Sequence, residues 1–127
     1  MGFANRYAQA AAGTASRERL MVMLFDKALA DIRSGAASME AVRPIEARRS
    51  MVSALEIVAE LHETLDRSRA PELCDRLGDI YRFVCVRLGD ASLSGDARMA
   101  REAERAFAPI VEGFGKAAAM IPQVEER

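Results

Sequence analysis

The fold is decided by residues 16–32, which read SRERLMVMLFDKALADI. Ser16 is a favourable helix N-cap, and Glu18 in the first turn suits the positive end of a helix. The apolar residues between Leu20 and Ile32 cover more than half of the helix circumference. A helix with so wide an apolar arc must be buried against several neighbours at once.

Three more helices are predicted after this one. Pro44 and Pro71 are each suited to a first helical position, where the missing N–H group has no cost. Ser94 or Asp96 would cap the last helix. Each segment carries apolar residues at three- and four-residue spacing, which indicates one buried stripe per helix. The expected helices span residues 16–39, 44–66, 71–90 and about 96–121.

This pattern predicts an all-α fold, an antiparallel four-helix bundle with an N-terminal tail or short capping helix. The chain has 127 residues and is 50% apolar, which suits one domain with a sizeable core. We expect a mobile N-terminal segment over residues 1–15, the bundle over residues 16–121, and a tail over residues 122–127.

Composition narrows the possible partners and location. The net charge is −1, so no basic excess indicates a nucleic-acid partner. The longest apolar run, Leu20 to Phe25, is far shorter than the roughly 20 residues of a membrane span, so no membrane insertion is expected. No apolar signal segment is visible. Cys74 and Cys85 would lie about 16 Å apart on one helix and cannot form a disulfide, which favours the cytoplasm.

The sequence shows no constellation for catalysis, a metal or a cofactor. His62 is the only histidine, and Ala59 stands where a Glu-x-x-His metal motif would need glutamate. A structural zinc site usually takes four nitrogen or sulfur ligands, more than one histidine and two cysteines supply. No phosphate-binding glycine loop is present. We therefore expect neither an enzyme nor a bound cofactor.

Three large apolar residues stand off the predicted stripes. Phe83 and Val86 lie to one side of the stripe of their helix, and Ile57 lies off the stripe of the preceding one. Together with Tyr7 in the N-terminal segment, they suggest a groove for a partner helix. Single exposed apolar residues are also normal on protein surfaces, so ordinary packing is an equal alternative.

Several motifs resemble the FliS-type flagellar export chaperones. These are Asn5-x-Tyr7, then Thr14-Ala15-Ser16, and then Met23-Leu24-Phe25-Asp26-x-Ala28-Leu29. Later segments from Ile57 to Asp66 and from Leu77 to Leu88 continue the likeness, which covers residues 5–115. The chain departs from the family pattern where Arg17 replaces a usual proline, Phe25 a usual tyrosine and Phe114 a frequent tryptophan.

The resemblance implies a cytoplasmic chaperone for flagellin. Such a protein binds the disordered C-terminal segment of flagellin, prevents premature polymerisation and delivers it to the flagellar type III export gate. Ile57, Tyr81, Phe83 and Val86 would form the protein-binding groove, and Tyr7 would be an N-terminal lid. The alternative is a helical-bundle regulatory or oligomerisation module without a chaperone role, and the oligomeric state stays open.

Overall fold

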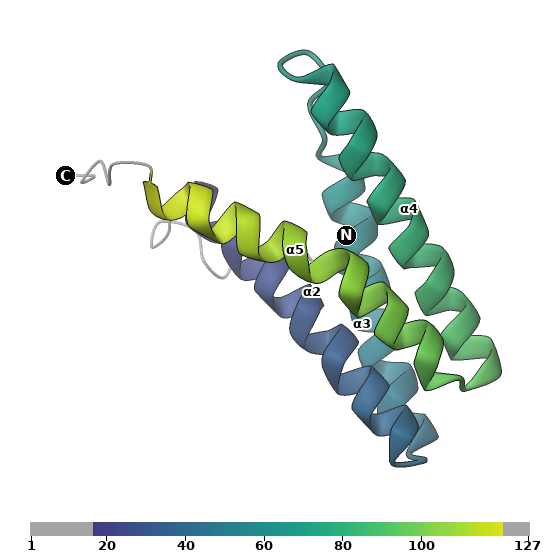
Figure 1. Ribbon diagram of the computed structural model, residues 1–127. Helices are drawn as coiled ribbons and strands as arrows, with labels where there is room; N and C mark the ends of the chain where they lie inside the picture. Colours follow the sequence, from purple (N-terminus) through teal and green to yellow (C-terminus); the bar gives the residue numbers. More distant parts are fainter. Residues whose placement is uncertain (1–16, 121–127) are drawn as a thin grey trace.

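Four helices make up the part of the protein that the computed structural model describes, residues 17–120 (Figure 1). They are α2 (Arg17–Glu40), α3 (Pro44–Glu63), α4 (Pro71–Ser94) and α5 (Ala97–Met120). The prediction of an all-α fold with four helices is confirmed. The expectations for residues 1–15 and 122–127 fall outside the described residues.

The helices run alternately up and down, and each packs against the helices next to it in the chain. In addition, α5 returns to pack against α2, so the four helices close a ring. Figure 1 shows α2 and α5 diverging from α3 and α4 toward the end where α3 connects to α4. We call this the open end of the bundle. No helix among residues 17–120 is long and apolar enough to span a membrane.

All four helices contribute to one buried apolar cluster. Because each helix has two neighbours, its buried arc is wider than a single stripe. Burying one large apolar side chain contributes roughly 1.5–3 kcal/mol, so this cluster is the main source of stability. The largest fully buried side chains are Ile32, Met51, Ile57, Val58, Tyr81, Val84, Leu88 and Phe107.

Polar side chains tie α2 to its neighbours. The carboxylate of Asp31, which is largely buried, accepts a hydrogen bond from Ser53 Oγ of α3 (2.5 Å) and one from Lys27 Nζ (3.0 Å). At the other side of α2, Arg101 of α5 donates to both carboxylate oxygens of Glu40 (2.7 and 3.1 Å). These contacts fix how α2 sits against α3 and α5.

The turn between α4 and α5 lies later in the chain than expected. The predicted end at Gly89-Asp90 is wrong, because α4 continues to Ser94 and buries Ala91 on the way. It ends at Gly95, whose φ of 73° is left-handed and whose N–H donates to the Ala91 carbonyl (2.7 Å). Glycine takes this conformation without a steric penalty, so Gly95 rather than Gly89 ends the helix.

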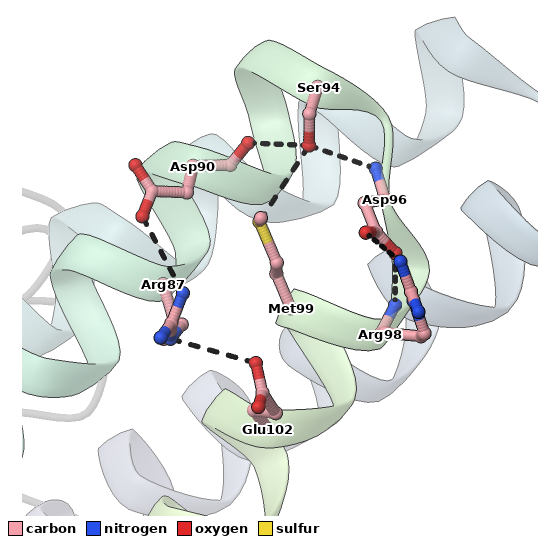
Figure 2. A network of polar contacts seen from close by, with 7 residues as sticks. All are labelled: Arg87, Asp90, Ser94, Asp96, Arg98, Met99 and Glu102. Atoms are coloured by element: carbon pink, nitrogen blue, oxygen red, sulfur yellow. Dashed lines mark hydrogen bonds and ion pairs between the residues drawn. The ribbon is translucent and has the colours of Figure 1, made fainter.

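The start of α5 confirms Asp96 as its cap. The Asp96 carboxylate accepts a hydrogen bond from the backbone N–H of Arg98 at 2.9 Å (Figure 2). Ser94 supports the same turn, since its hydroxyl donates to the Asp90 carbonyl (2.9 Å) and accepts from the N–H of Asp96 (3.2 Å). A short polar turn therefore joins two 24-residue helices.

The turn between α2 and α3 contains a strained residue. Val42 has a φ of 55°, and its side chain is 82% exposed. A β-branched residue is costly in this left-handed region, whereas glycine and asparagine tolerate it. The exposed side chain gains little burial in return.

Replacing Val42 should therefore stabilise the protein. We expect Val42→Asn to raise the free energy of unfolding by about 1 kcal/mol, because asparagine relieves the strain without the extra chain entropy of glycine. Urea denaturation followed by circular dichroism would measure the change. Val52→Asn, at an exposed helical position, is the matched control and should not stabilise; an unchanged midpoint for Val42→Asn would contradict the strain.

Candidate functional site

The open end of the bundle contains an apolar cleft of about 440 Å³, which we call the open-end cleft. All four helices contribute to it, because α2 and α5 diverge there from α3 and α4 (Figure 1). Asp66 is the one charged residue among those that line it. The lining residues are Met21, Phe25, Leu61, Thr64, Leu65, Asp66, Leu73, Leu77, Tyr81, Ile110, Gly113 and Phe114.

Aromatic rings form the inner part of the cleft. The ring of Phe25 lies 4.9 Å from that of Phe114 and 5.9 Å from that of Phe107, measured between centroids. Phe107 also contacts Tyr81 of α4 at 6.5 Å. These tilted contacts add to the burial energy of the rings and hold them in fixed orientations. The cleft therefore has a rigid floor that belongs to the bundle core.

Tyr81 lies where this floor meets α3. Its ring is 6.0 Å from that of His62, which is half-buried. Burial raises the pKa of Tyr81 to about 12, with a smaller contribution from Cys74. The phenol therefore stays neutral under any physiological condition and acts as an apolar wall with a polar tip.

The rim of the cleft carries one fixed negative charge. Asp66 accepts hydrogen bonds from the hydroxyl and the backbone N–H of Ser68 at 2.5 and 3.0 Å. These bonds lower the pKa of the Asp66 carboxyl. Within residues 17–120, no group of His, Cys, Asp and Glu is arranged to hold a metal ion. What the cleft offers is apolar surface for side chains of another molecule.

A second apolar surface lies on the outer side of α4, where Phe83 and Val86 are 43% and 60% exposed. The guanidinium of Arg87 lies over the Phe83 ring, 5.6 Å from its centroid. Arg87 is itself held by Glu102 of α5 (3.6 Å) and by Asp90 (3.8 Å), as Figure 2 shows. These ion pairs place the guanidinium, and the cation–π contact in turn orients the exposed ring.

The structure separates the four predicted groove residues. Phe83 and Val86 are exposed on α4, as expected. Ile57 is fully buried, so its expected position off the stripe is wrong. It is buried because α3 packs against both α2 and α4, which widens the buried arc toward Ile57. Tyr81 is 2% exposed and lines the open-end cleft, away from Phe83 and Val86. Tyr7 lies outside the described residues.

The sequence does not distinguish most cleft residues as a site, because their spacing is that of the buried stripes. Leu77 of α4, and Ile110 and Phe114 of α5, have ordinary core spacing, yet they remain half-buried at the open end. Leu73 is 55% exposed although it continues the same stripe. The available signal was that Leu73 and Leu77 lie toward the start of α4 and that Phe114 lies toward the end of α5, which an antiparallel arrangement brings to the same end of the bundle.

An apolar cleft on a helical bundle, with an exposed aromatic surface on another side of α4, is typical of modules that bind apolar segments of other proteins. The chain matches the family model described as flagellar protein FliS over residues 2–120. It belongs to the FliS family, whose members are cytoplasmic, non-enzymatic chaperones of flagellin export. This match confirms the resemblance seen in the sequence. No curated protein matches the chain.

Because the phenol of Tyr81 is buried, the free energy of unfolding should fall at alkaline pH. Because its folded pKa of about 12 exceeds the ordinary value of about 10, the folded state binds more protons between these values. We expect the contribution of Tyr81 to be intact below pH 10 and to fall by about 2 kcal/mol as the pH rises to 12.

The measurement is urea denaturation at pH 9 and pH 11.5, with Tyr81→Phe as the matched variant. The variant should lose less stability over this interval than the parent protein. Equal losses in the two proteins would show that Tyr81 ionises with an ordinary pKa.

Proposed function

We propose that the open-end cleft binds the C-terminal segment of flagellin by taking up apolar side chains of a helix. The observation that carries this proposal is the cleft itself, a pocket of about 440 Å³ lined almost entirely by apolar side chains from four helices. Leu73 supports it, because a leucine that is more than half exposed at the rim gains burial only when a partner covers it.

A disordered segment suits this site. Ordering such a segment costs conformational entropy, which the burial of apolar surface must offset. Phe25, Leu77 and Phe114 provide preformed contacts, so the chaperone itself needs little ordering. Recognition through apolar contacts also fits a chain with a net charge of −1.

The outer surface of α4 is the second part of the proposed site. Phe83 and Val86 lie on a different side of α4 from Leu73 and Leu77, so one rigid helix would not contact both sets. A segment that is disordered when free can wrap around α4 and reach both surfaces. Ile57 is fully buried, so it would act only through the packing of the core and not by contact with the partner.

Binding of this kind would mask the apolar segment of flagellin until export. We propose that the chaperone prevents premature polymerisation by covering this segment and then delivers it to the flagellar type III export gate. In this mechanism the apolar segment of flagellin contacts the chaperone in place of other flagellin molecules, without a covalent step.

A charge placed at the rim of the cleft should weaken flagellin binding. We expect Leu73→Glu to raise the dissociation constant for flagellin at least tenfold, because a carboxylate would have to be desolvated against the bound segment. Leu73 is exposed, so the variant should fold normally. Isothermal titration calorimetry with intact flagellin and with flagellin lacking its C-terminal segment measures both affinity and binding mode.

Leu93→Glu is the matched control, because Leu93 is 90% exposed on the same helix and does not line the cleft. It should bind like the parent protein, and Phe83→Glu should bind more weakly. Equal affinity of Leu73→Glu and the parent protein would move the site away from the cleft. Equally tight binding of the truncated flagellin would exclude the C-terminal segment as the ligand.

The proposed lid role of Tyr7 makes a separate prediction. If the N-terminal segment competes with flagellin for the groove, deleting residues 1–12 should leave the affinity unchanged or raise it, since no lid must be displaced. The same calorimetric titration measures this, with Tyr7→Ala as the smaller change. A large loss of affinity would instead make the segment a direct contact for flagellin.

A further inference from the structure

Gly113 of α5 leaves a space in the wall of the open-end cleft. It is exposed, and it lines the cleft together with Ile110 and Phe114 of the same helix. A Cβ atom added to Gly113 would have no heavy atom within 4 Å, apart from its chain neighbours and the backbone of its own helix. Within residues 17–120, therefore, no other helix packs against this point of α5.

The bundle itself does not require glycine at this position. Helix α5 continues to Met120, and Gly113 has an ordinary helical φ, unlike the left-handed Gly95. Glycine inside a helix is destabilising relative to alanine, because it loses more conformational entropy on folding. Neither the backbone conformation nor the packing of the described helices explains why this position lacks a side chain.

Two other helical glycines show what a packing requirement looks like. At Gly35 of α2, an added Cβ atom would collide with the end of the Met51 side chain of α3. At Gly78 of α4, it would meet Nε2 of His62 of α3 at 3.4 Å. Both of these glycines face a neighbouring helix, whereas Gly113 faces the cleft.

The surroundings of Gly113 suit an apolar group of limited size. Ile110 and Phe114 are its neighbours on the α5 wall of the cleft, and Leu77 belongs to the α4 wall. The ring of Phe114 is held against that of Phe25 of α2, with 4.9 Å between the centroids. Because the walls are apolar and closely packed, a group that reaches Gly113 must be apolar and must fit the space that the walls leave.

We infer that Gly113 is a specificity-determining residue for flagellin, an inference that rests on the function proposed above. In the complex, a large apolar side chain of the bound C-terminal segment packs directly against the backbone of α5 at Gly113. Glycine allows this close approach because it has no Cβ atom. Burial of the bound side chain contributes binding energy at a position where glycine makes the free protein less stable. The size of residue 113 therefore limits the side chain that the cleft accepts.

The test is to enlarge residue 113 and to measure stability and affinity separately. Gly113→Ala and Gly113→Leu should both raise the midpoint of urea denaturation, because alanine and leucine favour the helix. In calorimetric titration with intact flagellin, Gly113→Ala should raise the dissociation constant about threefold and Gly113→Leu at least tenfold, since overpacking a filled site is unfavourable. A purely structural role of Gly113 would not combine higher stability with weaker binding.

Gly115 is the matched control on the same helix. An added Cβ atom at Gly115 also has nothing within 4 Å, and Gly115 does not line the cleft. It lies about 160° from Gly113 around the helix. Gly115→Ala and Gly115→Leu should raise the denaturation midpoint in the same way and leave the affinity for flagellin unchanged.

Alanine substitutions in flagellin identify the side chain that occupies the space. Each large apolar residue of its C-terminal segment is replaced by alanine in turn, and each variant is titrated with the parent protein and with Gly113→Leu. One replacement should bring the two dissociation constants within about threefold of each other, because the cavity that it leaves accommodates the leucine. The ratio between the parent protein and Gly115→Leu should stay the same for every flagellin variant.

Leu73→Glu separates failure of this inference from failure of the proposed function. If Gly113→Leu binds flagellin like the parent protein while Leu73→Glu binds more weakly, flagellin occupies the cleft without contacting Gly113, and the inference alone is overturned. If neither variant binds more weakly, flagellin does not occupy the cleft, and the proposed function is overturned together with the inference.

Three further results would overturn the inference. Equal weakening by Gly113→Leu and Gly115→Leu would be an effect on the whole helix. Tighter binding by Gly113→Leu would show that the space stays empty in the complex, so that the leucine gains contacts there. If no flagellin variant narrowed the difference between the parent protein and Gly113→Leu, no single bound side chain would lie against Gly113.

Discussion

The structure depends on one aromatic contact, in which Phe107 of α5 bridges Phe25 of α2 and Tyr81 of α4. Phe107 is fully buried, and it joins helices that would otherwise meet only through their neighbours. Removing such a ring typically costs 3–5 kcal/mol. Next to this contact the helices begin to diverge, and Phe114 is only half-buried. The same contact therefore closes the core and supports Phe25 and Tyr81, two of the rings that line the cleft.

The helices can diverge at the open end because polar contacts join α2 and α5 toward the opposite end of the bundle. Arg101 links α5 to Glu40 of α2, and Glu104 of α5 accepts a hydrogen bond from Arg33 of α2 at 2.8 Å. The hydrogen bond from Arg33 is the main reason that the pKa of Glu104 is lowered. Each such pair contributes little alone, but a network with shared partners orients two helices. A bundle anchored in this way can leave one end open for a ligand.

The helices were predictable because their signals are local. Pro44, Pro71 and Asp96 mark helix starts through their own backbone and side-chain chemistry, and the structure has all three in those roles. The end of α4 was not predictable from Gly89 alone. A glycine in a helix costs about 1 kcal/mol, which burial of Ala91 and Leu88 offsets. Helix ends thus depend on what the next turn buries.

The sequence by itself determined four amphipathic helices, their order and the motifs shared with the FliS family, because these depend on neighbouring residues and on residue identity. Only the tertiary structure decided that Ile57 is core, that Tyr81 lines a cleft and that Leu73 stays exposed at its rim. A helical wheel gives the direction of a side chain but not the distance to the helix opposite. That distance is set by how the four helices diverge, and it determines which stripe residues remain available to bind a partner.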